Sequence, residues 1–242
     1  MSGMDTAMDT AMVMAAGFGT RMGALTRTRP KPMLPLTGRP MIDLTLDHVA
    51  DAGLSRAVVN LHYRGDQIRE HLTGRERPQI LFSEEQPEIL DTGGGIVQAL
   101  PLLGAGPFAV LNSDAVFVGP NPVEHLLRYW DPDRLDALML MVPVEQTIAY
   151  TRQGDFFLDA SSGVPLRRGD AERAPFVYAG AQIIRPEAFA TAPEGPFSTN
   201  LIWNALLAES RLQAVAYPGK WIDVGTPEGL VEAEAALGAH AP

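Results

Sequence analysis

The sequence predicts an α/β fold class: a single domain with a mixed, mainly parallel sheet and helices on both faces. Two observations support this. Short apolar runs alternate with helical patterns along the chain, which is typical of parallel strands joined by crossover helices. The chain has 242 residues, 46% of them hydrophobic and 20% charged. That composition provides enough apolar material for one medium-sized core.

The predicted elements follow from the N-terminus. A first buried strand is expected over residues 12–16, followed by a helix that begins near Pro40 and ends at Gly53. Further strands are predicted over 57–61, 79–82, 108–111, 137–142 and 177–181, and further helices over 65–72, 96–103, 122–130 and 228–237. Alternation of this kind binds ligands at the carboxyl ends of the strands.

Charge and composition exclude several classes of function. The net charge of −10 and the pI near 4.9 argue against nucleic acid or an anionic membrane as the main partner. The absence of cysteine rules out disulfides and thiolate zinc sites. No apolar stretch approaches the ~18 residues of a membrane span. We therefore expect a soluble cytoplasmic protein, with residues 1–10 and 238–242 as flexible tails.

The segment after the first strand has the features of a phosphate-binding loop. Gly17 and Gly19 allow a tight turn in which backbone N–H groups can face an anion. Arg21 adds a planar guanidinium and Lys31 a compact point charge. The stretch from 10 to 42 contains five basic residues and no acidic one, although the chain as a whole is acidic.

Two better-known phosphate loops do not fit. The dinucleotide pattern G-x-G-x-x-G needs a glycine at position 22, where the chain has Met22. The Walker pattern G-x-x-x-x-G-K-[ST] is absent, because Lys220 is followed by Trp221. The loop therefore belongs to neither of these classes.

The loop does resemble the signature of sugar-1-phosphate nucleotidyltransferases. The matching residues are M-A-A-G-F-G-T-R-M, beginning at Met14, and P-K-P-M-L-P around Lys31, with Met14 for the usual leucine and Ala24 for the usual proline. A second match is W-I-D-V-G-T-P, which begins at Trp221. The resemblance implies one Rossmann-like nucleotidyltransferase domain over residues 11–237, acting on a nucleoside triphosphate and a sugar 1-phosphate.

A glycine run lies before the predicted helix 96–103, which Pro101 is expected to interrupt. Thr92 can cap the helix, and the glycines leave bare backbone against which a flat ring or a phosphate could lie. A flexible turn would explain the glycines equally well. The run resembles the family segment that holds the nucleobase, which implies that Gly93 and Gly94 contact the nucleotide. The form D-T-G-G-G-I resembles the branch acting on N-acetylmuramate 1-phosphate.

Two aspartates are predicted to bind a metal. Asp114 follows the strand 108–111, and Asp223 follows an apolar pair near the C-terminus. Carboxylates at strand ends commonly hold a hard divalent cation, although either residue could instead form a turn. The resemblance assigns both to one Mg²⁺, and we expect them at the same edge of the sheet. Ser113 occupies a position where the family usually has glycine.

The resemblance also implies roles for individual residues. The catalytic residues are Arg21, Lys31, Asp114 and Asp223; the nucleotide-binding residues are Ala16, Gly17, Gly19, Thr20, Arg21, Lys31, Gly93 and Gly94; the sugar-binding residues are Asn112, Gly154, Asp155 and Gly180. Relatives often carry a lysine near position 198, where this chain has Ser198.

The expected reaction is attack of a sugar phosphate oxygen on the α-phosphorus of UTP, with release of pyrophosphate. The favoured acceptor is N-acetylmuramate 1-phosphate, in peptidoglycan recycling. Two alternatives stay open: a mannose-1-phosphate guanylyltransferase, and a catalytically inactive sensor of nucleotide sugars. We expect a monomer or a weak homo-oligomer.

Overall fold

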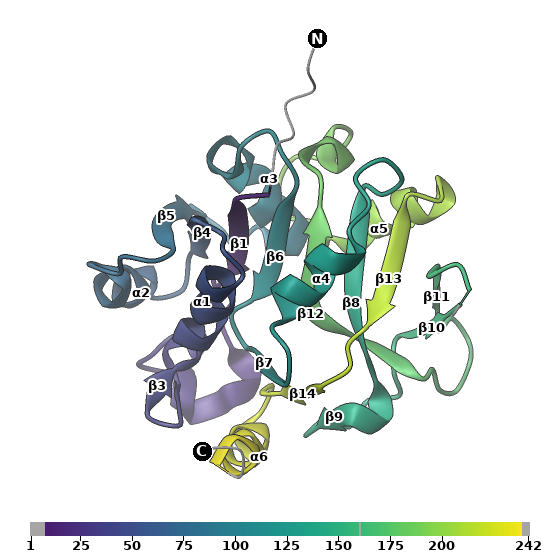
Figure 1. Cartoon of the computed structure of the whole chain (residues 1–242). Coiled ribbons are helices and arrows are strands. Elements are labelled where there is room, and N and C mark those ends of the chain that lie inside the picture. The colour runs from purple at the N-terminus through teal and green to yellow at the C-terminus, as the bar shows by residue number, and fades with distance from the viewer. Residues whose placement is uncertain (1–7, 160, 239–242) are drawn as a thin grey trace.

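A mixed sheet runs through the centre of the computed structural model, which describes residues 8–159 and 161–238 (Figure 1). Its strands are β1 Thr10–Met14, β4 Arg56–Leu61, β5 Gln79–Glu84, β6 Phe108–Asn112, β8 Ala137–Pro143, β10 Phe156–Leu158, β11 Pro165–Arg167, β12 Phe176–Ile184 and β13 Leu212–Ala216. The order within the described residues is β11-β10-β12-β6-β1-β4-β5, and β8 joins β13 to β12.

The register brings several strand ends to one edge. Strands β5, β4, β1 and β6 are parallel, so Val13 of β1 lies beside Val59 on one side and Leu111 on the other. Strand β12 runs antiparallel to both β6 and β8. The prediction of a mixed, mainly parallel sheet is confirmed, and the loops that follow β1 and β6 emerge side by side.

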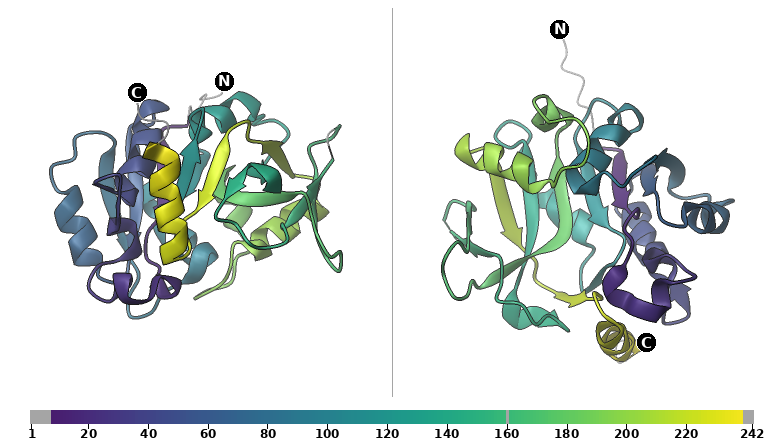
Figure 2. Two further views of the ribbon diagram at one scale, coloured as in Figure 1. Left: turned by 90° about the horizontal axis from the view of Figure 1, so that it is seen from below. Right: turned by 180° about the vertical axis from the view of Figure 1, so that it is seen from behind.

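Helices cover both faces of the sheet, as predicted. They are α1 Met41–Asp51, α2 Gly65–Leu72, α3 Asp91–Leu103, α4 Pro122–Tyr129, α5 Asn200–Ala208 and α6 Pro227–Gly238. Alternate residues of β1 point to opposite faces. Ala11 and Val13 pack with α1, α2 and α4, whereas Met12 packs with α3 and α5. Figure 2 shows α3 and α5 from behind, on the face opposite α1 and α4.

A second, smaller sheet closes the lower end of the molecule in Figure 1. It consists of β7 Ala115–Val118, β14 Lys220–Asp223 and β9 Thr147–Ile148. Helix α6 packs beside this sheet and against the loop that follows β1, where Met22, Ile222 and Ala233 share one buried cluster. The C-terminal segment is thereby fixed next to the predicted phosphate loop. A short hairpin, β2 Pro35–Leu36 and β3 Arg39–Pro40, completes that side.

In the described part of the chain, short 3-10 helices occupy four connections, over Thr20–Thr26, Lys31–Met33, Val144–Gln146 and Pro186–Phe189. The first two carry Arg21 and Lys31, so both basic side chains come from tight, regular turns. Pro30 and Pro32 flank Lys31 and restrict its backbone.

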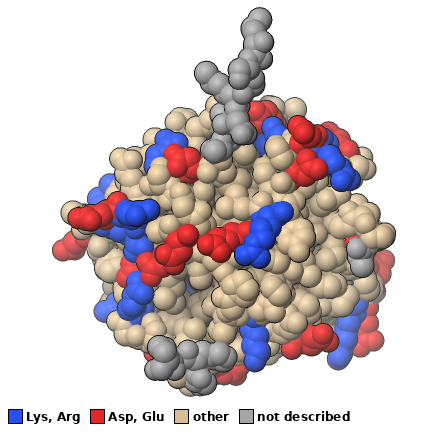
Figure 3. Space-filling view, in the orientation of Figure 1, with Lys and Arg blue, Asp and Glu red and all other residues tan. Residues whose placement is uncertain are grey.

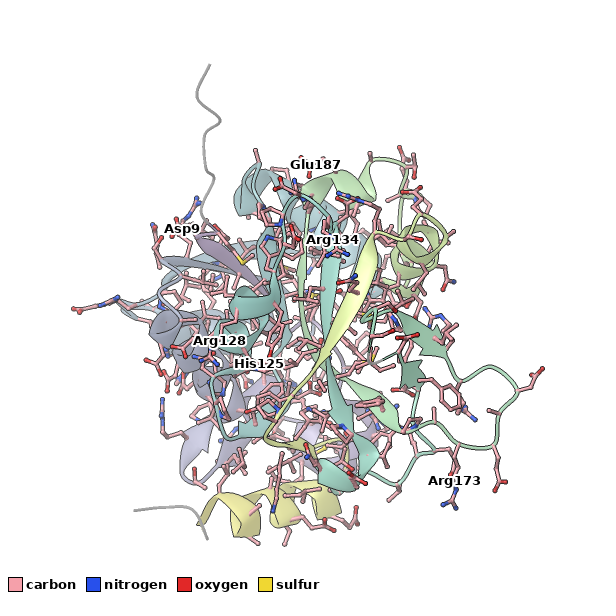
Figure 4. All side chains as sticks on the ribbon, turned by 45° about the vertical axis from the view of Figure 1, so that its right-hand side comes forward. Asp9, His125, Arg128, Arg134, Arg173 and Glu187 are labelled. Carbon is pink, nitrogen blue, oxygen red and sulfur yellow. The ribbon has the colours of Figure 1, made fainter. Side chains whose placement is uncertain are left out.

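The boundaries of β1 differ from the prediction. The strand covers Thr10–Met14 rather than 12–16. Ala15 and Ala16 are buried but leave the ladder, and the Ala15 N–H donates to Asn60 Oδ1 at 2.6 Å. Asp9, expected in a flexible tail, forms an ion pair with Arg56 at 3.4 Å and is labelled in Figure 4. Thr10, also expected in that tail, is instead the first residue of β1. The remaining residues of the predicted tails, apart from Met8 and Gly238, lie outside the described residues.

Helix α3 corrects two expectations. It begins at Asp91, includes the whole glycine run and continues through Pro101 without a break. Thr92 does not cap it; the Thr92 hydroxyl accepts a hydrogen bond from the Thr199 N–H at 2.9 Å. The glycines are needed for close packing, because a Cβ on Gly94 would lie 2.5 Å from the Gly195 carbonyl oxygen. Tertiary contacts therefore extend the helix against glycine's low intrinsic propensity.

The acidic net charge is not gathered in one place on the face shown in Figure 3, where acidic and basic side chains are interspersed. No helix in the described part of the chain is both long enough and apolar enough to cross a membrane.

Candidate active site

Three cavities meet at the carboxyl ends of β1 and β6. The first, about 340 Å³, lies over the loop that follows β1 and is lined by Gly17, Arg21 and Lys31. The second, about 510 Å³, lies between α5 and the β10–β11 hairpin, and the third, about 260 Å³, lies at the small sheet. Asn112, the last residue of β6, lines all three. The cavities are therefore compartments of one cleft.

The loop after β1 has the geometry of an anion cradle. Gly19 adopts φ 63°, and a Cβ there would lie 2.9 Å from Lys31 Cβ, so glycine is required on both grounds. Within the described residues, the amide groups of Ala16, Gly17 and Gly19 donate to no protein acceptor. These residues line the first cavity with Thr20 and Arg21. Unpaired amides beside a guanidinium favour bound phosphate oxygens.

Lys31 lies below this loop and is buried, with 8% exposure. Its ammonium forms an ion pair with Asp114, whose side chain keeps 33% exposure. A buried ammonium needs a counter-charge, and Asp114 provides one at the wall of the first cavity. The pair brings together two predicted catalytic residues that are distant in the sequence.

Asp223 reaches the cleft from a different sheet than predicted. It is the last residue of β14 in the small sheet, not at the edge of the main one. The antiparallel pairing of β14 with β7 sets Asp223 opposite Ala115, the neighbour of Asp114. Both carboxylates line the third cavity. The expectation of a shared sheet edge was wrong, but the two aspartates are neighbours across the small sheet.

Arg152 and Gly225 both lie next to the Asp223 carboxylate. Arg152 Nη2 lies 3.6 Å from Asp223 Oδ2. Gly225 packs between Asp223 and Arg21: a Cβ at this position would be 2.9 Å from Asp223 Oδ1 and 2.8 Å from Arg21 Nη1. The W-I-D-V-G-T-P segment therefore links a predicted metal ligand to the predicted phosphate-binding arginine.

The donor set of the third cavity fits Mg²⁺. The described residues contain no cluster of three or more metal-ligating side chains. Mg²⁺ is commonly bound by one or two carboxylates, with water and substrate phosphates completing its octahedron. Asp114 and Asp223, next to an anion cradle, match that pattern.

Gly180 makes room for Asn112. The pairing of β12 with β8 shifts register between Tyr178 and Gln182, and Gly180 within this bulge has φ 74°. A Cβ on Gly180 would lie 2.8 Å from Asn112 Nδ2. Glycine therefore allows the Asn112 amide to lie across β12 at the junction of the three cavities.

Gly154 and Asp155 have different roles. Gly154 is buried and lines none of the three cavities of the described residues; a Cβ there would lie 2.0 Å from the Ala174 carbonyl oxygen. Asp155 lines the second and third cavities. The structure thus places Asp155 in the cleft and gives Gly154 a packing role instead of the predicted sugar contact.

Gly93 and Gly94 were expected to contact the nucleotide, but neither residue lines the cleft. Both are buried, and their N–H groups donate to the Phe197 carbonyl at 2.8 and 3.3 Å. The start of α3 is thereby occupied by the protein's own backbone. Asp91 and Thr92, which directly precede Gly93, line the first and second cavities instead.

Two features account for departures from the expected sequence pattern. Ser113 is buried and its hydroxyl donates to the Met14 carbonyl at 2.7 Å, so its side chain is satisfied within the protein. Position 198 carries no lysine, but Arg167 and Arg168 line the same second cavity as Ser198. Sequence reasoning missed these arginines because nothing in the R-R pair indicates which cavity the hairpin faces.

Buried groups of the first cavity were also missed. Glu85 has no exposed surface; it accepts from Asn60 Nδ2 at 2.6 Å and from the Leu90 N–H at 2.7 Å. Asn60 in turn accepts from the Ala15 N–H. This chain of hydrogen bonds joins the loop after β1 to the segment before α3, and so sets the width of the first cavity.

Comparison with known proteins agrees with this geometry. A model of the MobA-like NTP transferase domain matches residues 11–216, most of the chain. The chain belongs to this family of NTP transferases. The prediction of a nucleotidyltransferase domain made from the loop and from W-I-D-V-G-T-P is thereby confirmed.

Two similar curated proteins are N-acetylmuramate α-1-phosphate uridylyltransferases. The one from Caulobacter vibrioides is 40% identical over 97% of this chain and 99% of its own length. The one from Neisseria meningitidis serogroup B is 33% identical over 95% of this chain and 98% of its own length. A mannose-1-phosphate guanylyltransferase catalytic subunit from Drosophila melanogaster is 25% identical, and this chain covers 60% of it.

Solved structures share the fold. A UDP-glucose pyrophosphorylase in complex with UDP-glucose aligns with a TM-score of 0.80 and 19% identity, over 97% of this chain and all of that one. HddC from Yersinia pseudotuberculosis, in complex with GMP-PN, aligns with a TM-score of 0.76 and 23% identity, over 95% of this chain and all of that one.

Proposed function

We propose that this protein transfers a uridylyl group from UTP to N-acetylmuramate 1-phosphate, giving the nucleotide sugar and pyrophosphate. The observation that carries the proposal is the three-part cleft, in which an anion cradle, a pair of aspartates and a larger polar cavity meet at Asn112. The similarity to two uridylyltransferases over nearly the whole chain supports the choice of substrates.

We assign one substrate group to each compartment. The nucleotide occupies the first cavity, with its β- and γ-phosphates on the amides of 16–20 and on Arg21. The phosphates that react meet in the third cavity, beside Asp114 and Asp223. The sugar occupies the second cavity, near Asn112 and Asp155. This order follows the connections between the cavities, because the first and third share Arg21 and Asp114, and the second and third share Asp155.

In the proposed reaction, a phosphate oxygen of the sugar 1-phosphate attacks the α-phosphorus of UTP, and the bond to the β-phosphate breaks. Such a step depends on positioning and on neutralising charge. Lys31 lies at the wall between nucleotide and aspartates, where its ammonium can approach the α-phosphate. Arg21 stabilises the charge that develops on the leaving pyrophosphate. We propose that Asp114 and Asp223 hold Mg²⁺, which as a Lewis acid supplies charge neutralisation at phosphoryl oxygens.

Several finer statements are part of this proposal. UTP is preferred over GTP, the product belongs to peptidoglycan recycling, and the reaction takes place in the cytoplasm, where the nucleotide substrate is made. We expect a monomer or a weak homo-oligomer.

Pyrophosphate release tests the proposal. The assay crosses UTP, GTP, CTP and dTTP with N-acetylmuramate, N-acetylglucosamine, glucose and mannose 1-phosphates, in the presence of Mg²⁺. The proposal predicts the highest kcat/KM for UTP with N-acetylmuramate 1-phosphate. A preference for GTP with mannose 1-phosphate would move the protein to the guanylyl branch, and nucleotide binding without turnover would favour a sensor.

A further inference from the structure

The second cavity carries positive charge that the proposed transfer reaction does not use. Arg152, Arg167 and Arg168 all line it, in a chain whose net charge is −10. Its acidic lining residues are Asp91 and Asp155. Arg152 is already paired with Asp223 at 3.6 Å, whereas Arg167 and Arg168 form no ion pair with a described residue. The charges of these two arginines can therefore be neutralised by an anionic group on a ligand.

Arg167 is held in place by neutral groups. Its Nε donates to Asn204 Oδ1 at 2.9 Å and its Nη2 to Asn200 Oδ1 at 3.0 Å. These asparagines are four residues apart and so lie on one face of α5. Within the described residues Arg167 forms no ion pair, and its Nη1 donates to no protein atom. The side chain is oriented while its charge and part of its donor fork stay available.

Arg168 adds a second unsatisfied donor. Its Nη1 donates to the Ala171 carbonyl at 3.2 Å, whereas its Nε is buried and has no hydrogen-bond partner. The Arg168 N–H donates to the Asp155 carbonyl at 2.8 Å, which fixes the end of β11 against the cavity. The Arg168 Nη2 donates to no described protein atom and so can donate to an acceptor on a ligand.

Part of the lining of the second cavity is aromatic. Trp203 and Tyr178 contact each other edge to face, with ring centroids 4.8 Å apart, and Trp203 Nε1 donates to Gln182 at 2.8 Å. All three residues line the second cavity. Burial raises the pKa of Tyr178 above its ordinary value, in keeping with its enclosed position in the wall of the cavity. A cavity lined by two aromatic rings and two guanidinium groups suits a sugar ring that carries one acidic substituent.

We infer that Arg167 and Arg168 bind the carboxylate of an acidic substituent on the sugar of the sugar 1-phosphate, and so select acidic over neutral sugars. This inference rests on the proposed function, since it assigns the sugar to the second cavity. N-acetylmuramate differs from N-acetylglucosamine by a lactyl ether that bears a carboxylate. The arginine pair provides the recognition of that difference, and the phosphate-binding residues at the other end of the cleft are common to both sugars.

The test compares wild type and its variants with two sugars. Wild type, Arg167→Gln, Arg168→Gln and Arg173→Gln are assayed with UTP and either N-acetylmuramate or N-acetylglucosamine 1-phosphate. Arg173 is a matched control, because it is exposed, lies on the loop between β11 and β12, and points away from the body of the molecule in Figure 4. We expect each of the first two variants to lower kcat/KM for the acidic sugar by about 10- to 100-fold, as expected for lost hydrogen bonds to a charged group.

The neutral sugar separates recognition from structural damage. We expect its kcat/KM, and the KM for UTP, to change less than about threefold in every variant, and Arg167→Lys to recover part of the loss because it keeps the charge without the fork. Equal losses on both sugars, or none, would overturn the inference while leaving the proposed function intact. A wild-type enzyme that favours the neutral sugar would overturn both. Arg168→Gln gives an independent answer if Arg167→Gln unfolds.

Discussion

Replacing Gly225 with alanine tests whether the geometry around Arg21 and Asp223 governs the reaction. The added methyl group would lie 2.8 Å from Arg21 Nη1 and 2.9 Å from Asp223 Oδ1. Ordinary contacts begin near 3.4 Å, so each group must retreat by about half an ångström. The backbone of Gly225 has no positive φ, so alanine itself fits the local conformation.

The size of the effect follows from that displacement. Misplacing a reacting group by about 1 Å costs on the order of 100-fold in rate, so half that shift should cost about tenfold, or ~1.4 kcal/mol of transition-state stabilisation. The overlapping atoms are the ends of two side chains that can move. We therefore expect a change in Tm of no more than about 4 °C.

The assay is steady-state pyrophosphate release, with UTP and Mg²⁺ each titrated. Gly225→Ala should lower kcat/KM for UTP about tenfold and raise the Mg²⁺ concentration needed for half-maximal rate. Gly238→Ala is the control, because a Cβ there meets nothing within 4 Å. Unchanged values of both kcat/KM and the Mg²⁺ midpoint in Gly225→Ala would refute the link between this glycine, Arg21 and Asp223.

Three further predictions concern metal binding, packing and pH. Asp223→Asn should lower turnover by about 100-fold or more while the Tm stays near that of wild type, and retention of most activity would exclude Asp223 as a metal ligand. Gly154→Ala should lower the free energy of unfolding by about 3 kcal/mol and the Tm by about 6 to 12 °C. The reason is that Gly154 has φ 76° and that the new Cβ would lie 2.0 Å from a backbone oxygen. A stable variant with a raised KM for the sugar alone would instead support the predicted sugar-binding role of Gly154. Burial lowers the pKa of His125 below 6.5, so the unfolded chain binds the proton more tightly, and thermal stability should fall as the pH drops below about 6.5. That loss should be smaller in His125→Gln, and an equal loss in the variant would assign the pH dependence to other groups.

Much of the fold is readable from local patterns. The helix over 65–72 and the strand near 57–61 match α2 and β4 closely, because each combines a clear periodicity with glycine or polar boundaries. The boundary of β1 shifted because Ala15 and Ala16 are apolar and buried like strand residues, yet neither belongs to the ladder, and the Ala15 N–H donates to the Asn60 side chain instead. Periodicity reports burial, not hydrogen-bond partners.

Site residues within a short sequence motif could be predicted, whereas those whose role depends on contacts between distant segments could not. The loop around Arg21 and Lys31, and both aspartates, line the cleft as expected. The role of Gly93 could not be read locally, since the carbonyl that occupies its N–H comes from Phe197, far along the chain. Arg167 likewise lines the second cavity only because the β10–β11 hairpin packs against α5.

The fate of labelled oxygen tests the central claim most directly. N-acetylmuramate 1-phosphate carrying ¹⁸O in its nonbridging phosphate oxygens is incubated with UTP, Mg²⁺ and the protein, and both products are analysed by mass spectrometry. Attack of the sugar phosphate on the α-phosphorus predicts that all of the label is found in the uridine diphosphate sugar and that the pyrophosphate is unlabelled. Label in the pyrophosphate, or no nucleotide sugar from a folded protein that binds both substrates, would contradict the account.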